Sequence, residues 1–295
     1  MTQRHGTLLL GHPRSGTTIL RRVLGQHPDI YAPPELHLFG ACARMLRADT
    51  NAIGLDVGAL AGLAFAGFAE EEVLKRLRDF AFGFLDEATE KAGKDIWLEK
   101  TAFDIFELDG IERLCGKHVT YLGIIRHPVD VALSTIDFCR DMGRYPSVLH
   151  PYIARYADPL EAFLHSWADT TRALMSLGTR RPDQVTICRY EDLLDDPAGM
   201  ASDILGAIGA SPHEMVTNLG GSPDGFADRE ASRSGSVDSN RKPRWKDLPD
   251  FRLSAVAPIV ADLMDILGYD SLPDADPLSQ DDARRAYSLG LATKP

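Results

Sequence analysis

Short runs of apolar residues alternate along this chain with longer segments in which apolar positions recur every three or four residues. The short runs predict buried strands, and they lie at residues 7–11, 95–98, 120–125 and 184–188. The longer segments predict amphipathic helices, and they lie at about residues 17–27, 70–90, 128–142, 159–177, 198–209 and 252–267. Because strands and helices alternate, we expect an α/β fold with a central, mainly parallel sheet flanked by helices.

One segment departs from this pattern, because residues 220–249 are rich in Gly, Ser, Asp and Arg and poor in apolar residues. Long loops inside compact domains usually carry function or are disordered. The chain has no internal repeat and no stretch of linker composition, so we expect a single domain over residues 1–295. We expect its core at about residues 7–270 and a C-terminal tail at 271–295.

The composition of the chain argues against nucleic-acid, membrane and metal partners. The chain of 295 residues carries 32 Lys and Arg against 43 Asp and Glu, a formal net charge of −11. This acidic balance argues against a nucleic-acid partner. No run approaches the roughly 18 to 20 apolar residues of a membrane-spanning helix, and the N-terminal residues do not resemble a secretion signal. We therefore expect no membrane partner and a cytoplasmic location. The four cysteines are scattered without metal-ligand spacing, so we expect no metal.

The loop between the first predicted strand and the first predicted helix, residues 11–18, reads Gly-His-Pro-Arg-Ser-Gly-Thr-Thr. Backbone N–H groups and the positive end of the helix dipole converge in such a loop and favour an anion. A guanidinium and hydroxyl side chains add donors for phosphate oxygens. We therefore expect a P-loop-like phosphate site formed by Arg14, Ser15, Gly16, Thr17 and Thr18.

A second candidate phosphate site follows the strand predicted at residues 120–125. Arg126 stands at the carboxyl end of that strand, the edge at which open α/β sheets bind ligands, and Ser134 lies in the helix that follows. Two phosphate sites on neighbouring strand ends suit a nucleotide that is phosphorylated at both ends. Thr17 stands where the P-loop motif has its lysine, and this difference disfavours ordinary Mg²⁺-nucleoside triphosphate chemistry.

Residues 13–18 resemble the 5′-phosphosulfate loop of sulfotransferases that use 3′-phosphoadenosine 5′-phosphosulfate (PAPS), with Arg14 typical of the bacterial and tyrosylprotein branches. Residues 124–134 are similar to the segment that holds the 3′-phosphate in that family, and the resemblance implies this role for Arg126 and Ser134. The string at 189–193 resembles the family's Y-E-D-L segment, which implies a place near adenine for Tyr190. The family often has a basic stretch that closes over the nucleotide, and the candidates here are Arg241, Lys242 and Arg244.

The same resemblance implies catalytic groups. Sulfuryl transfer is an in-line displacement that requires a base for the acceptor hydroxyl and positive groups near the leaving phosphate. Glu35 falls at the position of the catalytic Glu of the tyrosylprotein branch, and residues 33–38 also resemble sulfotransferase domains of bacterial polyketide synthases. His37 is the rival base, two residues further along. Lys100 resembles a family Lys at a strand end that contacts the transferring sulfuryl group, where it would act together with Arg14.

The resemblance implies a transferase of secondary metabolism that moves a sulfuryl group from PAPS to a hydroxyl of a small-molecule acceptor, with adenosine 3′,5′-bisphosphate (PAP) as product. We expect a small hydroxylated metabolite or a carrier-bound acyl chain as the acceptor, and a free enzyme rather than a domain of a polyketide synthase. Two alternatives stay open: a P-loop kinase or nucleotide hydrolase, and a nucleotide-binding module without catalysis. The segments at 40–90 and 145–180 are expected to shape the acceptor pocket.

Overall fold

The computed structural model describes residues 5–50, 56–213 and 243–273, together with residues 279, 281, 282, 284, 285, 287 and 288. Within this part of the chain, five strands form one sheet in the order β2-β5-β1-β6-β7, and each neighbouring pair is parallel. The strands are β1 (His5–Leu10), β2 (Ile30–Tyr31), β5 (Ile96–Glu99), β6 (Thr120–Ile125) and β7 (Val185–Arg189). The predicted α/β fold class is confirmed.

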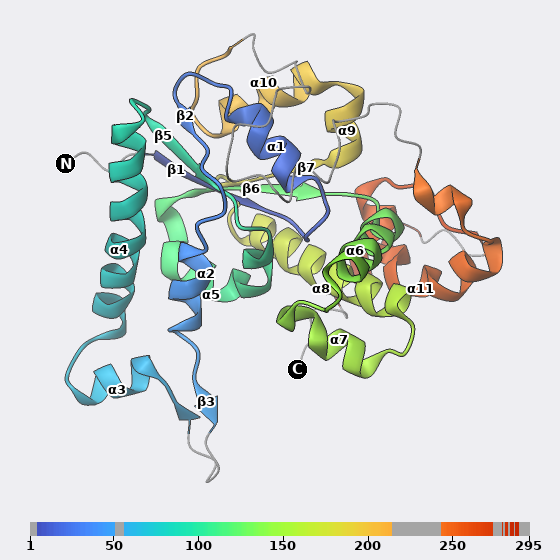
Figure 1. Ribbon diagram of the computed structural model, residues 1–295, viewed down its shortest axis with the longest axis horizontal. Helices are drawn as coiled ribbons and strands as arrows, with labels where there is room; N and C mark the ends of the chain where they lie inside the picture. Colours follow the sequence, from blue (N-terminus) through green and yellow to red (C-terminus); the bar gives the residue numbers. More distant parts are fainter. Residues whose placement is uncertain are drawn as a thin grey trace.

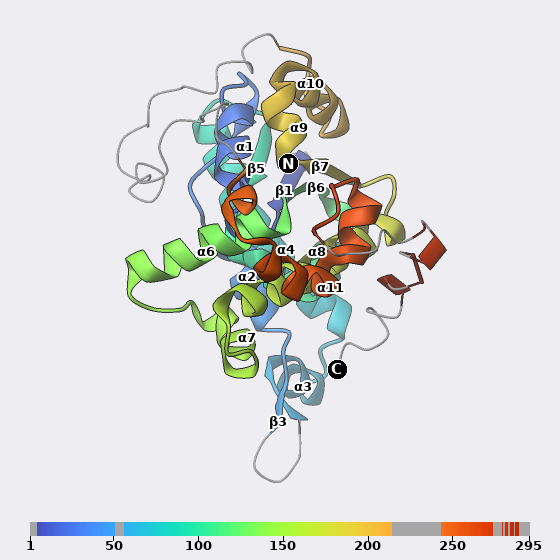
Figure 2. The ribbon, with the colours of Figure 1, turned by 90° about the vertical axis from the view of Figure 1, so that its right-hand side faces the viewer.

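Helices cover both faces of this sheet (Figures 1 and 2). One face carries α1 (Thr17–Leu24), α9 (Tyr190–Asp195) and α10 (Pro197–Ala207). The other carries α2 (Leu38–Arg44), α4 (Glu70–Lys91), α5 (Leu108–Cys115), α6 (Pro128–Met142), α8 (Pro159–Arg180) and α11 (Asp250–Leu267). Successive strand side chains point to opposite faces. Leu9 therefore packs with the first set of helices, whereas Leu8 and Leu10 pack with the second.

All five strands run the same way, so their carboxyl ends meet at one edge of the sheet. The chain leaves β1 at Gly11, β5 at Lys100, β6 at Arg126 and β7 at Tyr190. In the register of the sheet Leu8 pairs with both Glu99 of β5 and Tyr121 of β6, so β1 lies between the strands that precede Lys100 and Arg126. This topology gathers segments that are far apart in the sequence.

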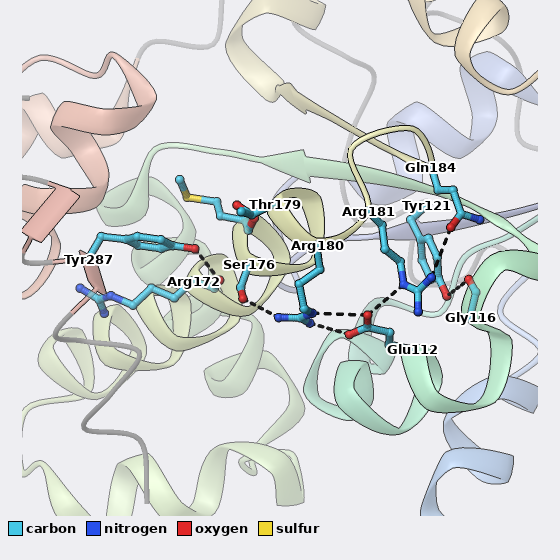
Figure 3. A network of polar contacts seen from close by, with 11 residues as sticks. Glu112, Gly116, Tyr121, Arg172, Ser176, Thr179, Arg180, Arg181, Gln184 and Tyr287 are labelled. Atoms are coloured by element: carbon cyan, nitrogen blue, oxygen red, sulfur yellow. Dashed lines mark hydrogen bonds and ion pairs between the residues drawn. The ribbon is translucent and has the colours of Figure 1, made fainter.

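At the amino ends of the strands, a polar network connects the C-terminal end of α8 with α5 and with the residue before β7 (Figure 3). Arg180 and Arg181 both donate to the Glu112 carboxylate of α5, at 2.5 Å and 2.9 Å for their shortest bonds. Arg181 also donates to the Gln184 side chain, just before β7, at 3.3 Å. The network fixes α8 relative to α5 and to the start of β7, far from the carboxyl ends of the strands.

The helices predicted from periodicity are all present, within three residues of the expected bounds. The elements that were not predicted are short: the strand β2, the helices α2, α5 and α9, and also α3 (Ala59–Phe65), α7 (His150–Arg155) and the antiparallel hairpin of β3 (Asp49–Thr50) with β4 (Asp56–Val57). Elements of two to eight residues are too brief for a periodic pattern. Of the segment expected as a long loop, residues 220–242 lie outside the described residues, and Arg244–Asp247 form a 3₁₀ turn. No helix in the described part of the chain is long and apolar enough to span a membrane.

Candidate active site

The loop that follows β1 has the tight geometry of an anion-binding turn. Gly16 has φ +99° and directly precedes α1, and Arg14 has φ +77°, which is rare for a residue with a side chain. A Cβ atom on Gly11 would lie 2.5 Å from the Ile124 carbonyl oxygen, and one on Gly16 would lie 2.4 Å from Tyr190 Cδ2. Both glycines are therefore required by close contacts, Gly11 with the backbone of β6 and Gly16 with the Tyr190 ring at the start of α9.

His12 connects this loop to helix α8, and nothing in the sequence indicated this contact. Its ring is buried, and Nδ1 donates to the Pro13 carbonyl at 2.8 Å while Nε2 lies 3.0 Å from Ser166 Oγ in α8. Burial lowers the pKa of His12 to about 4, so the ring is neutral at physiological pH. The loop is thus held against the helix layer without adding charge to the site.

The two predicted phosphate-binding elements lie in direct contact. Arg14 Nε donates to Ser134 Oγ in α6 at 3.1 Å, and Arg126 Nη1 donates to the Arg14 carbonyl at 3.3 Å. Arg126 is buried, forms an ion pair with Asp130 at 3.5 Å, and lies with its guanidinium carbon 4.7 Å from the centre of the Tyr190 ring. Residues from β1, β6, α6 and the start of α9 therefore form one continuous group.

Two buried donors in this group lack a protein acceptor. Among the residues that the structure describes, the Ser15 hydroxyl and the Arg126 Nε have no hydrogen-bond partner. Buried polar groups are nearly always paired, so an unpaired donor at a binding site calls for an explanation. An anion bound at each of the two places would supply the missing acceptor.

The carboxyl end of β5 contributes a buried lysine. Lys100, whose side chain is 4% exposed, donates to Thr18 Oγ1 at 3.1 Å and to Glu35 Oε1, and the Glu35 side chain is 23% exposed. His37 Nε2 lies 4.0 Å from Glu35 Oε2, but the His37 side chain is 62% exposed. Glu35 and Lys100 thus form a close ion pair at the start of α1, whereas His37 stands at the rim.

These side chains border one cleft of about 790 Å³, counting the open solvent at its mouth. The residues that line the cleft come from the segments that follow the carboxyl ends of all five strands of the sheet. They are Pro13, Arg14, Gly16, Thr17, Thr18, Ile19, Glu35, Ala102, Phe103, Arg126, Ser134, Phe138 and Tyr190. Most of the residues expected from the sequence therefore share one cavity.

The remaining expected residues lie elsewhere. Ser15 and Lys100 are buried directly behind the cleft wall. Arg244 donates to Asp137 Oδ2 on α6 at 2.7 Å and does not line the cleft. Arg241 and Lys242 lie outside the described residues.

The segment around Arg244 is attached to the site through its neighbour Trp245. The Trp245 N–H donates to Asp130 Oδ1 at 2.9 Å, and its indole stacks on the His127 ring with 4.9 Å between centroids and 9° between planes. Burial, reinforced by nearby Arg126, lowers the pKa of His127 to about 3. This stack brings residues 243–247 next to the ion pair of Arg126 and Asp130.

Two aromatic residues of the cleft were not singled out from the sequence. Phe138 lies one turn after Ser134 in α6, and its ring centroid is 5.5 Å from the Arg14 guanidinium carbon. Phe103 follows β5 in a 3₁₀ turn and stacks on Phe106 at 6.5 Å. The spacing from Ser134 was the available signal for Phe138, since residues four apart share a helix face. These rings add apolar surface to the cleft beside its charged groups.

This chain is similar in sequence to known proteins. A family model described as "Sulfotransferase family" matches residues 7–214. The nodulation protein NoeE of Sinorhizobium fredii (strain NBRC 101917 / NGR234) is 28% identical over 278 residues, which cover 89% of this chain. The chain spans 65% of the length of that curated relative.

Solved structures share the fold. The sulfotransferase domain of the olefin synthase of Synechococcus PCC 7002 superposes with a TM-score of 0.56 at 17% identity, covering 100% of this chain and 98% of that domain. Mouse sulfotransferase SULT7A1, solved as a complex with PAP, superposes with a TM-score of 0.50 at 12% identity, covering 98% of this chain and 89% of that protein.

Proposed function

Because this chain belongs to the sulfotransferase family, we propose that it moves a sulfuryl group from PAPS to a hydroxyl of a small-molecule acceptor. One observation carries the proposal: the two candidate phosphate-binding elements, which follow the neighbouring strands β1 and β6, line one cleft with Glu35, and the Glu35 carboxylate pairs with the buried Lys100. The two candidate phosphate-binding elements suit a nucleotide with phosphates at both ends. The ion pair supplies a base and a cation beside them.

The donor nucleotide fits the residues present. The loop of residues 14–18 and the N-terminus of α1 would hold the 5′-phosphate end, while Arg126 and Ser134 would hold the 3′-phosphate. The unpaired donors Ser15 Oγ and Arg126 Nε support an anion at both places. Tyr190 would lie near the adenine. When bound, PAPS supplies an electrophilic sulfur and a stable leaving group, and the mouse relative was solved with the product PAP.

Glu35 is the proposed general base, because its carboxylate lines the cleft and His37 does not. In the reaction the acceptor hydroxyl passes its proton to Glu35 while its oxygen gains the sulfuryl group. Lys100 and Arg14 would offset the negative charge that develops on the leaving oxygen, and such preorganised donors contribute most where water is excluded. The contact between Lys100 and Thr18 keeps the ammonium group at the start of α1.

The acceptor is proposed by class alone. Phe103 and Phe138 line the cleft beside its charged groups, which favours a hydroxyl on a largely apolar molecule. A small hydroxylated metabolite meets this requirement. A carrier-bound acyl chain meets it equally, and one structure with the same fold is, by its name, a sulfotransferase domain of an olefin synthase.

The proposal is tested by calorimetric titration with PAP, with AMP, and with ATP plus Mg²⁺, followed by turnover of sulfur-labelled PAPS with a panel of hydroxylated acceptors. We expect tight binding of PAP that Arg126→Ala weakens by at least tenfold, because a charge-assisted contact contributes about 1.5–3 kcal/mol. Equal or tighter binding of ATP plus Mg²⁺ would contradict the proposal and favour kinase-like chemistry. Binding of neither nucleotide would contradict it as well.

A further inference from the structure

We propose that Glu99 and Thr101 are positioning residues that hold the backbone beside Glu35, so that its carboxylate meets both Lys100 and the acceptor hydroxyl. This inference deepens the proposed function and rests on it, since it concerns the orientation of the proposed base. Neither residue lines the cleft, and both are 2% exposed, so they act through the chain that they hold.

At the carboxyl end of β5, successive side chains contact different parts of the site. Successive side chains of an extended segment point to opposite sides. Lys100 therefore points one way, to the Glu35 carboxylate and to Thr18. Glu99 and Thr101 point the other way, toward the loop that precedes α2. Residues 35–37 thus contact both sides of the strand end. The Glu35 carboxylate meets Lys100 on one side, and the Leu36 and His37 N–H groups meet Glu99 and Thr101 on the other.

Three hydrogen bonds join this loop to the strand end. The His37 N–H donates to Thr101 Oγ1 at 3.1 Å, and the Leu36 N–H donates to Glu99 Oε1 at 3.4 Å. The Thr101 hydroxyl in turn donates to Glu99 Oε1 at 2.6 Å. Since the hydroxyl proton is directed at Glu99, a lone pair of the same oxygen is left to face His37. One threonine hydroxyl therefore bridges the buried carboxylate and the loop.

The backbone at His37 needs such a restraint. His37 has φ +59° and ψ 16°, in the left-handed region, which residues with a Cβ atom seldom occupy. The bond from its N–H to Thr101 lies at this residue, immediately after the segment that carries Glu35. Loss of the hydroxyl would let His37 relax toward ordinary φ values, and the direction of the preceding residues would change with it.

The test compares Thr101→Val, which keeps the shape of the side chain without its hydroxyl, with Thr101→Ser, which keeps the hydroxyl. We expect Thr101→Val to lower kcat about 10- to 100-fold, because a displacement of about 1 Å at a reacting group can cost 10²-fold. The Kd for PAP should stay within about twofold of the wild type, since no nucleotide-binding group is changed. Thr101→Ser should restore most of kcat.

A second readout is hydrogen exchange at the amides of Leu36 and His37, which does not depend on turnover. We expect faster exchange at both amides in Thr101→Val and protection near the wild-type level in Thr101→Ser. Glu99→Leu removes the acceptor oxygen and should speed exchange at the Leu36 amide and lower kcat in the same direction as Thr101→Val. A Thr101→Val variant with wild-type kcat and unchanged exchange would overturn the inference.

The readouts separate this inference from the proposed function. If the wild-type protein binds PAP but transfers no sulfuryl group, the proposed function fails while the exchange experiment still reports on the loop. If the wild type turns over and Thr101→Val loses kcat and PAP affinity together, the residue serves overall structure and the positioning role is wrong. If the Thr101→Val variant is obtained in too low a yield of folded protein, Thr101→Ala takes its place, and the same outcomes apply to it.

Discussion

Replacement of Gly16 by Ala tests how the phosphate loop is packed. Gly16 has φ +99°, and a Cβ atom added to it would lie 2.4 Å from Cδ2 and 2.8 Å from Cε2 of the Tyr190 ring. Both distances are shorter than any ordinary carbon contact. Tyr190 is itself buried, and the Arg126 guanidinium lies over its ring, so the ring cannot move without disturbing Arg126. The substitution must therefore strain the backbone and displace the ring.

The two costs can be separated with a control in the same chain. A left-handed conformation costs a residue with a Cβ atom about 1–2 kcal/mol, and overpacking a filled site costs about 1–3 kcal/mol. Gly67 has φ +87°, but a Cβ atom there would meet open space among the described residues. Gly67→Ala should show the first cost alone. We expect Gly16→Ala to lower the free energy of unfolding by about 1–3 kcal/mol more than Gly67→Ala does.

Denaturant unfolding gives these free energies, and PAP titration gives the functional consequence. The Arg126 guanidinium lies over the Tyr190 ring at 4.7 Å, so displacement of the ring moves Arg126 as well. We expect Gly16→Ala to weaken PAP binding at least tenfold, whereas Gly67→Ala leaves it unchanged. If Gly16→Ala is no less stable than Gly67→Ala and binds PAP like the wild type, the reasoning from close packing is refuted.

Other predictions concern the ion pair and a buried acid. Glu35→Gln should lower kcat by about 10²–10⁴-fold, the usual contribution of a general base, with unchanged PAP affinity; an equal loss in His37→Gln would instead favour His37 as the base. Lys100→Met should lower kcat by about 10²–10³-fold in the same assay. Burial raises the pKa of Asp104 to about 8, so the folded state holds a proton that the unfolded state releases above its pKa of about 3.9. Unfolding curves should therefore show stability falling as pH rises from about 4 to 8, by up to about 1.4 kcal/mol per pH unit, and Asp104→Asn should lack this component.

The features that the sequence could predict are those in which a local pattern and a buried face coincide. The strand before Gly11, the glycine loop and the amphipathic helix after it follow one another directly, so their order alone predicts an anion site. The parallel sheet then brings Arg126 to the same edge, because parallel strands share the position of their carboxyl ends. The long helices α4, α6, α8 and α11 could also be predicted, because each buries one face and its apolar residues therefore recur with helical periodicity.

The features that escaped prediction depend on tertiary contacts. Lys100 was predicted at the site through the family resemblance, but its pairing with Thr18 and Glu35 was not, because it depends on the strand order that places β5 beside β1. His12 and Thr101 are unremarkable in the sequence, since their roles come from partners 154 and 64 residues away. The short helix α2 begins at Leu38 after a left-handed His37, a start that no residue preference signals.

The charge distribution of the site follows from the same arrangement. The chain carries a net charge of −11, yet Arg14, Lys100 and Arg126 gather at one edge of the sheet. Lys100 pairs with Glu35, Arg126 with Asp130, and Arg14 donates to Ser134, so each cation already has a fixed direction. Donors that are oriented in advance need little reorganisation when negative charge develops near them. The acidic partners Glu35 and Asp130 therefore make the cluster of cations tolerable in the folded protein and hold Lys100 and Arg126 in place.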